Sequence, residues 1–184
     1  MSGPVVLVLA SGRGERFIAS GGTGSKLQAL IGGTSVLQRT LAAVRASGLP
    51  CHLEDAGHEG MGDSIAAAVR ATPYASGWLV LPGDLPLVRP ETLRSVAAAL
   101  SQHLVVVPHY RGRRGHPVGF AAQCRDELLS LKGEKGAAAV VRAHAEQAMT
   151  MELEDPGIVA DIDTLQDLAD AQRQFAAQSP PDPH

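Results

Sequence analysis

Hydrophobic residues in this chain fall into two kinds of pattern that alternate along the sequence. Three short runs are almost entirely apolar and rich in β-branched residues, at Val5–Ala10, Trp78–Leu81 and Leu104–Val107. Such runs are typical of strands buried on both faces. Between the first two, Val36, Leu37, Leu41 and Val44 recur at helical spacing and predict a helix over 36–46. The alternation predicts a three-layer α/β/α domain with a mostly parallel sheet.

Shorter patterns predict the remaining elements. Strands are expected over 52–54, 118–120, 149–153 and 158–160, and helices over 65–71, 90–100, 125–131, 137–144 and 164–174. Asp63 or Ser64 is the expected cap of the helix over 65–71, and Pro90 suits the first turn of the next. With no repeat and no internal linker, residues 1–177 are predicted to form one domain. The segment QSPPDPH, residues 178–184, is predicted to be a disordered tail.

Composition narrows the classes of partner. The 184 residues are 45% hydrophobic but only 3% aromatic, so the core must be built from aliphatic side chains. A net charge of −3 argues against nucleic acid as the main partner. Cys51 and Cys124 lie far apart and form no zinc or disulfide framework. The first apolar run is too short for a signal or membrane segment, so a cytoplasmic protein that binds no membrane is expected.

The loop after the first predicted strand combines glycine with positive charge. In LASGRGERF, residues 9–17, Gly12 and Gly14 allow successive N–H groups to turn towards one point. Arg16 and Lys26 could then neutralise a polyphosphate. The alternative is an ordinary Gly-rich connection with solvated cations. Neither a Walker loop nor a complete GxGxxG fingerprint is present, which argues against P-loop hydrolysis and dinucleotide chemistry.

Two other loops after predicted strands carry carboxylates. Asp84 follows a buried strand in PGDLP, and Asp161 and Asp163 follow the run at 158–160. In α/β sheets, ligands bind at the carboxyl ends of the strands, and one or two carboxylates with substrate phosphates suit Mg²⁺. The alternatives are a turn aspartate at Asp84 and a helix cap at Asp163, which is the expected role of Asp163 on local grounds.

Three further segments are candidates for binding. GMGDS, residues 60–64, is a loop entering a helix, so its N–H groups and hydroxyl could contact a ligand or simply cap that helix. RGRRGHP, residues 111–117, could hold a phosphorylated second substrate or form an exposed hairpin tip. His52, Glu54, Asp55 and His58 fit no regular set of metal ligands, and a solvated loop is predicted there.

Six segments in this order resemble the MobA-like NTP transferase family, in particular its molybdenum cofactor cytidylyltransferase branch. They are LASGRGERF with Lys26, GMGDS, PGDLP, GHPVGF (115–120), GEKGAAAVV (133–141) and DIDTLQDL (161–168). The resemblance implies a Rossmann-like nucleotidyltransferase fold. The guanylyltransferase branch usually has a second glycine where Ser11 stands and lacks GHPVGF, so the resemblance favours CTP over GTP.

The resemblance also implies roles for individual residues. The nucleotide is expected at Leu9, Ala10, Ser11, Gly12, Arg13, Gly14, Arg16, Lys26, Gly60, Met61 and Ser64. Asp84 matches the family's Mg²⁺ aspartate, with Asp161 or Asp163 as the second position, and Lys26, Arg16 and Asp84 are the expected catalytic residues. Arg113, Arg114, Gly115 and His116 are candidates for holding the acceptor.

The implied activity is transfer of CMP from CTP to the phosphate of a molybdopterin-type cofactor, with Mg²⁺ as cofactor and pyrophosphate as product. Such a reaction depends on positioning and charge stabilisation rather than on a covalent intermediate. A molybdoenzyme or its maturation chaperone is an implied partner. The alternatives are a guanylyltransferase that uses GTP and a non-catalytic cofactor carrier, which would need no metal-triphosphate site.

Overall fold

Strand β1 (Val5–Leu9) is buried on both faces, as its sequence predicts. Successive side chains of a strand point to opposite faces, so Leu7 packs with one layer of helices and Val8 with the other. In the computed structural model, which describes residues 3–178, β1 pairs in parallel with β4 (Cys51–Glu54) and β5 (Gly77–Pro82). These three strands form the part of the sheet that carries the loop after β1 (residues 9–17) and the loop after β5 (residues 82–86).

Within residues 3–178 the sheet has seven strands in the order β4-β1-β5-β8-β6-β7, with β9 paired to β6. The remaining strands of this sheet are β6 (Val105–Tyr110), β7 (Arg113–Arg114), β8 (Val118–Ala121) and β9 (Ala148–Glu152). Strands β4, β1, β5, β6 and β9 run in one direction, while β7 and β8 run in the other. The prediction of a mostly parallel sheet is confirmed.

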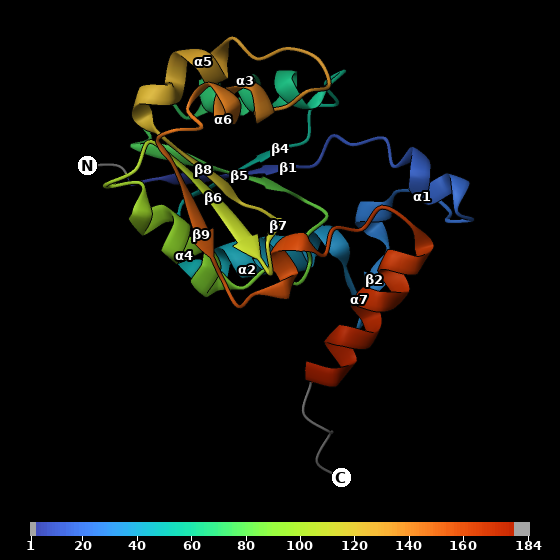
Figure 1. The fold of residues 1–184 in the computed structure, drawn as a ribbon. Coiled ribbons are helices and arrows are strands. Elements are labelled where there is room, and N and C mark those ends of the chain that lie inside the picture. Colours follow the sequence, from blue (N-terminus) through green and yellow to red (C-terminus); the bar gives the residue numbers. More distant parts are fainter. Residues whose placement is uncertain (1–2, 179–184) are drawn as a thin grey trace.

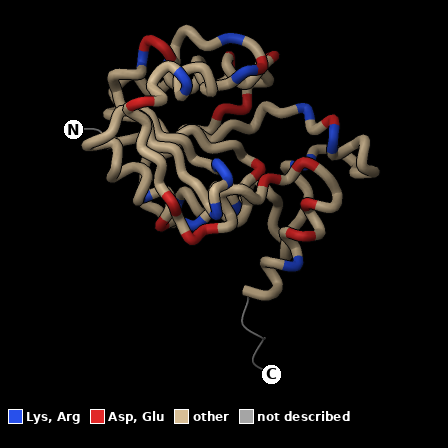
Figure 2. The backbone as a smooth tube through the Cα atoms, in the orientation of Figure 1, with Lys and Arg blue, Asp and Glu red and all other residues tan. Residues whose placement is uncertain are grey.

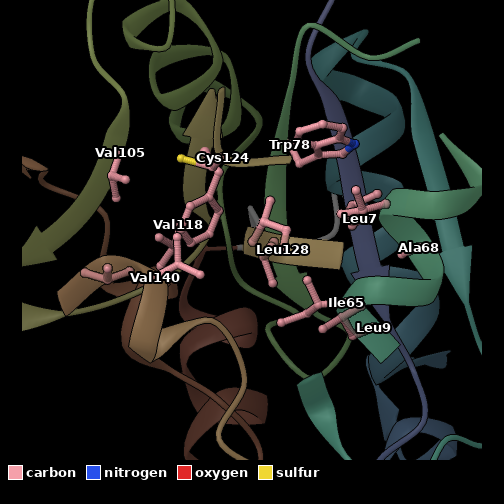
Figure 3. Packing of buried hydrophobic residues seen from close by; sticks show 14 of the residues in the cluster. Leu7, Leu9, Ile65, Ala68, Trp78, Val105, Val118, Cys124, Leu128 and Val140 are labelled. Carbon is pink, nitrogen blue, oxygen red and sulfur yellow. The ribbon is translucent and has the colours of Figure 1, made fainter. Parts of the chain in front are cut away.

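Helices cover both faces of the sheet (Figure 1). The helices are α1 (Glu15–Ala19), α2 (Val36–Ser47), α3 (Met61–Ala71), α4 (Pro90–Ala99), α5 (Arg125–Leu129), α6 (Ala138–Ala143) and α7 (Leu165–Gln178). Helices α3, α5 and α6 share a cluster of buried residues with one face, part of which is shown in Figure 3. Helices α2 and α4 cover the opposite face. The structure therefore has the expected three layers.

Helix α7 lies beside the sheet rather than on either face (Figure 1). It packs over the short hairpin of β2 (Leu30–Ile31) and β3 (Thr34–Ser35) through a third cluster that contains Ile31, Ile162 and Ala171. This packing brings the segment that carries Asp161 and Asp163 close to the loop after β1. No helix among residues 3–178 is long and apolar enough to cross a membrane.

Three local predictions are wrong or incomplete. Helix α3 begins at Met61 with Gly60 before it, so Asp63 and Ser64 lie inside the helix instead of capping it. The strand predicted over 158–160 is absent, because Pro156–Val159 forms a 3₁₀ turn that Asp155 caps through the N–H of Gly157. The predicted tail over 178–184 lies outside the described residues except for Gln178, which ends α7.

Asp155 anchors this 3₁₀ turn to α4 and is only 3% exposed. Its carboxylate accepts hydrogen bonds from the Thr92 hydroxyl at 2.6 Å, the Arg89 N–H at 3.0 Å and the Gly157 N–H at 2.9 Å. Asp155→Ala would leave these donors without a partner, so we expect the free energy of unfolding to fall by about 3 kcal/mol. Urea denaturation measures the loss. The exposed Asp126→Ala on α5 is the control, and a loss at Asp155 no larger than this control would contradict the prediction.

Candidate active site

The loop after β1, the loop after β5 that carries Asp84, and the segment that carries Asp161 and Asp163 meet in one cleft at the carboxyl ends of β1 and β5. The cleft has a volume of about 660 Å³ and is lined by residues from the loop after β1, the start of α3, the loop after β5, β7 and the segment before α7. Open α/β sheets bind ligands at this edge. The cleft is therefore the candidate active site.

Backbone hydrogen bonds fix the loop that carries Asp84. The Gly83 N–H donates to the Leu9 carbonyl at 2.8 Å, and the Gly83 carbonyl accepts from the buried Thr40 hydroxyl at 2.8 Å. A Cβ atom at Gly83 would lie 3.0 Å from the Leu9 oxygen, so glycine permits this close approach. The Asp84 carbonyl in turn accepts from the Ile162 N–H at 3.0 Å. Asp84 is thus held on rigid backbone.

An ion-pair cluster forms the polar centre of the cleft. The Lys26 ammonium lies 2.7 Å from Asp84 Oδ2 and 3.0 Å from Asp163 Oδ1, and Arg16 Nη1 lies 3.1 Å from Asp163 Oδ2. Lys26 and Asp84 are only 12% and 13% exposed, whereas Arg16 is 81% exposed. Lys26 and Asp84 therefore form the buried part of the cluster, and Arg16 its solvent-exposed part.

The pKa values reflect burial and the crowding of acids. Burial and the negative charge of Asp163 raise the pKa of Asp84 despite the nearby Lys26. Burial, followed by the charges of Asp84 and Asp163, also raises the pKa of Asp161. Burial acts to raise the pKa of Asp163 too, but the hydrogen bonds and charges of Lys26 and Arg16 outweigh it and lower the pKa. The site thus holds more acidic charge than Lys26 alone neutralises.

Asp163 is free to join this cluster because other residues cap α7. The Asp167 carboxylate accepts from the Thr164 N–H at 2.7 Å, and the Asp167 N–H donates to the Thr164 hydroxyl at 3.2 Å. This reciprocal pair has the form of a capping box. The prediction that Asp163 caps the helix is therefore wrong, and its side chain faces Lys26 and Arg16 instead.

The loop after β1 presents unpaired backbone donors. Among residues 3–178, no acceptor is found for the N–H groups of residues 11–14. Gly14 has φ +64°, and an added Cβ would contact the Lys26 side chain at 3.6 Å. Unpaired N–H groups beside a lysine match the predicted phosphate-binding loop.

The Gly-rich insert between Arg16 and Lys26 is folded back on itself. Phe17 is buried over Gly22, where a Cβ would lie 2.4 Å from the ring, and the Gly22 N–H donates to the Phe17 carbonyl. The Ser20 hydroxyl accepts from the Leu165 N–H at 2.9 Å, at the first residue of α7. The insert therefore connects the loop after β1 to the helix that follows Asp163.

The start of α3 forms a second wall of the cleft. The Ser64 hydroxyl lies 2.6 Å from the Ser11 hydroxyl, which joins this wall to the loop after β1. Asp63 accepts from the Gly133 N–H at 3.0 Å, and Gly60 packs so closely on Gly133 that a Cβ would lie 2.3 Å from its carbonyl carbon. Two residues of the GMGDS segment, Gly60 and Asp63, are thus required for packing against the loop at 133–136.

Comparison with known families identifies the chain. The model of the MobA-like NTP transferase domain matches residues 42–148, more than half of the chain. The chain belongs to the MobA-like NTP transferase family. The matched residues include Asp84 and β7 but not the loop after β1 or Asp161 and Asp163, whose place in the site rests on the geometry above. None of the curated proteins that were compared matches this NTP transferase significantly.

Solved structures show the same fold. Rv0371c from Mycobacterium tuberculosis superposes with a TM-score of 0.79 at 23% identity, covering 94% of this chain and 98% of that chain. A second structure of Rv0371c contains manganese. A nucleotidyl transferase from Methanothermobacter thermautotrophicus gives 0.77 at 19% identity, over 97% and 100% of the two chains. Molybdopterin-guanine dinucleotide biosynthesis protein A from Archaeoglobus fulgidus gives 0.65 at 18%, over 95% and 100%.

The third wall of the NTP transferase cleft is basic. Arg113 and Arg114 on β7 are exposed and line the same cleft as Asp84, Asp161 and Asp163. Figure 2 shows how basic and acidic positions are distributed along the backbone. Burial and the charge of Arg114 lower the pKa of His116 to about 4, so its ring is neutral at pH 7. Arg111 lies at the hairpin tip with its guanidinium 5.2 Å from the Tyr110 ring centroid.

Most of the residues expected from sequence lie together in this cleft. Those that line it are Leu9, Ser11, Gly12, Arg13, Gly14, Arg16, Lys26, Gly60, Met61, Ser64, Asp84, Arg113, Arg114, His116, Asp161 and Asp163. Ala10 is not among them, and its N–H donates to the Glu54 carbonyl. Gly115 is buried against Ile158. His58, Glu59 and Glu134 also line the cleft but were not predicted as site residues.

Proposed function

We propose that this NTP transferase moves CMP from CTP to the phosphate of a molybdopterin-type cofactor and releases pyrophosphate. The observation that carries the proposal is the cluster of Lys26, Asp84 and Asp163 beside the unpaired N–H groups of residues 11–14. Cationic groups, carboxylates and free N–H donors together are the groups that a metal-bound triphosphate requires, and this supports the proposal.

The acidic residues fit a divalent cation. Asp84, Asp161 and Asp163 each offer a carboxylate oxygen within 4.8 Å of the others. Asp84 Oδ1 is buried and has no hydrogen-bond partner among residues 3–178, which leaves it available as a ligand. All-oxygen donors suit Mg²⁺ and Mn²⁺. When bound, such an ion would neutralise charge on the triphosphate.

The residues of the chain supply positioning and charge. Lys26 and the N–H groups of residues 11–14 bind phosphate oxygens, and the exposed Arg16 reaches those nearest to solvent. Asp84 and Asp163 orient Lys26 before substrate arrives. An acceptor phosphate is largely ionised near pH 7, so the reaction requires no strong general base. Rate enhancement arises from holding the two phosphates in line.

The acceptor belongs on the basic wall. Arg113 and Arg114 can hold an anionic phosphate by charge-assisted hydrogen bonds. The neutral His116 contributes hydrogen bonding without further charge. A non-catalytic carrier would use this wall alone, and it would bind pterin without releasing pyrophosphate.

A pyrophosphate-release assay tests the proposal. Each NTP is supplied with Mg²⁺ or Mn²⁺ and a molybdopterin acceptor, and kcat/KM is compared. We expect CTP to exceed GTP by about tenfold or more, since a base-reading contact contributes roughly 1–3 kcal/mol. Higher kcat/KM with GTP would reject the choice of CTP, and absence of pyrophosphate release with every NTP would favour the carrier.

Ser11 is the residue on which the choice of CTP partly depends. Ser11→Gly removes the hydroxyl that contacts Ser64 and enlarges this end of the cleft. We expect the preference for CTP over GTP to fall by about tenfold, or about 1.4 kcal/mol. The same assay measures the ratio, with the exposed Ser101→Gly as control. An unchanged ratio in Ser11→Gly would show that Ser11 does not select the base.

A further inference from the structure

A buried carboxylate at the end of β4 holds two histidines. Glu54 is 10% exposed, and its two oxygens accept hydrogen bonds from different rings: His58 Nε2 lies 2.9 Å from Oε1, and His52 Nε2 lies 3.1 Å from Oε2. The Ala56 N–H also points to Oε1 at 3.4 Å. The prediction of a solvated loop here is wrong for these three residues, and of the four residues in that prediction Asp55 alone is exposed.

The carboxylate determines which nitrogen of each ring carries a proton. Burial acts to raise the pKa of Glu54, but the hydrogen bonds from His58, His52 and Ala56 outweigh it and lower the pKa. Glu54 is therefore ionised at neutral pH and can only accept hydrogen bonds. Each Nε2 must be the donor, and whenever the ring is neutral the other nitrogen of His58, Nδ1, is then an acceptor.

His58 belongs to the part of the cleft that remains for the nucleobase. Under the proposed function, Lys26, the three aspartates and the N–H groups of the loop after β1 are at the phosphate end, and β7 forms the acceptor wall. The lining that remains includes the Ser11 side chain, residues 58–61 and Ser64. The Ala10 N–H donates to the Glu54 carbonyl at 2.9 Å, so these two segments are joined at this point. His58 lines the cleft here, whereas His52 does not.

We propose that His58 reads the exocyclic amino group of cytosine through Nδ1 and thereby selects CTP over UTP. Glu54 is a positioning residue that fixes the tautomer of His58, and His52 holds Glu54 through its other carboxylate oxygen. Cytosine carries an amino donor where uracil carries a carbonyl acceptor. Uracil would place two acceptors against each other and leave both unsatisfied. This inference rests on the proposed use of CTP and adds the group that recognises its base.

Equilibrium binding of CTP and UTP with Mg²⁺ and no acceptor tests this role. At about pH 8, where histidine is normally neutral, we expect the wild-type protein to bind CTP about tenfold or more tighter than UTP. In His58→Ala the two affinities should come within about threefold, mainly because CTP binding weakens. Glu54→Gln keeps the shape of the side chain but can also donate, which frees the tautomer, so the CTP/UTP ratio should fall there too.

The chain offers a matched control in a second histidine–glutamate pair. His144 Nε2 lies 2.7 Å from Glu127 Oε1, with the ring 22% exposed, and neither residue lines the cleft. His144→Ala should keep the wild-type CTP/UTP ratio. If His58→Ala does not fold, Glu54→Gln decides the same question.

The outcomes separate this inference from the proposed function. Tight CTP binding by the wild-type protein with an unchanged CTP/UTP ratio in folded His58→Ala or Glu54→Gln would overturn the role of His58 alone. Equal affinity of the wild-type protein for CTP and UTP would do the same. Tighter binding of GTP than of CTP would instead overturn the use of CTP, and this inference with it.

Discussion

Replacing Asp84 by asparagine is expected to reduce nucleotidyl transfer by about 10³-fold or more, equivalent to about 4 kcal/mol in the activation barrier. Asparagine keeps the shape of the side chain and the backbone bonds of its loop but removes the buried carboxylate. At the position of the unpartnered Oδ1, asparagine has either an NH₂ group, which cannot bind a cation, or an uncharged carbonyl oxygen, which binds it more weakly. The loss therefore affects the metal site rather than the fold.

Asp84→Asn should not reduce folding stability, although it reduces activity. The pKa of Asp84 is raised by burial, so the folded state disfavours its ionised form. Stability attributable to this group falls as the pH rises from its unfolded-state pKa to its folded-state pKa. At neutral pH, Asp84→Asn should therefore not lower the melting temperature.

Thermal melts with and without Mn²⁺ distinguish these effects. A ligand that binds the folded state raises the melting temperature, so Mn²⁺ should stabilise the wild-type protein and the control Asp126→Asn but not Asp84→Asn. Normal pyrophosphate release by Asp84→Asn, or an undiminished Mn²⁺ shift, would show that Asp84 holds no metal.

Lys26→Met should produce the second large loss, with a different signature. Lys26 is the only cation that contacts both Asp84 and Asp163 among residues 3–178. Its removal leaves the buried Asp84 without a cation and close to Asp163, which keeps only the exposed Arg16, so we expect the free energy of unfolding to fall by about 3 kcal/mol, as when a buried ion pair is broken. Activity should fall by about 10²- to 10³-fold because the phosphates lose a preorganised cation.

A metal titration distinguishes this explanation from simple loss of packing. In Lys26→Met no cation competes for Asp84, so Mn²⁺ alone should raise the melting temperature more than in the wild-type protein. Arg16→Met is the control for surface charge, because Arg16 is mostly exposed. An Mn²⁺ shift in Lys26→Met no larger than in the wild-type protein would contradict the prediction.

Local sequence patterns were sufficient to predict the strands and loops that carry the residues proposed to bind phosphate and metal. The runs at β1 and β5 are apolar because both faces of these strands are buried, and Pro82-Gly83-Asp84 marks the end of β5 unambiguously. Order along the chain then placed Asp84 and the loop after β1 at the same edge of a parallel sheet. The proximity of Asp84 to the loop after β1 was thus predictable from strand direction.

Residues whose roles depend on partners distant in sequence were assigned less well. Asp163 has the local setting of a helix cap, and its contact with Lys26 arises only because α7 packs beside the sheet. Likewise, Glu54 follows an apolar residue in a short strand, and nothing in its local pattern shows that the Ala10 N–H and two histidines enclose it. The spacing of His52, Glu54 and His58 was visible, but spacing alone does not reveal burial.

The hydrogen bond from the Ile162 N–H to the Asp84 carbonyl has a consequence for local unfolding. It joins the loop after β5 to the segment that carries Asp161 and Asp163, and the buried Ile162 side chain anchors that segment beneath α7. Neither loop can open without breaking this bond, so the two should behave as one cooperative unit. A fluctuation that detaches α7 would therefore move Asp161 and Asp163 away from Asp84 together, so the three candidate metal ligands would be either assembled as a set or separated.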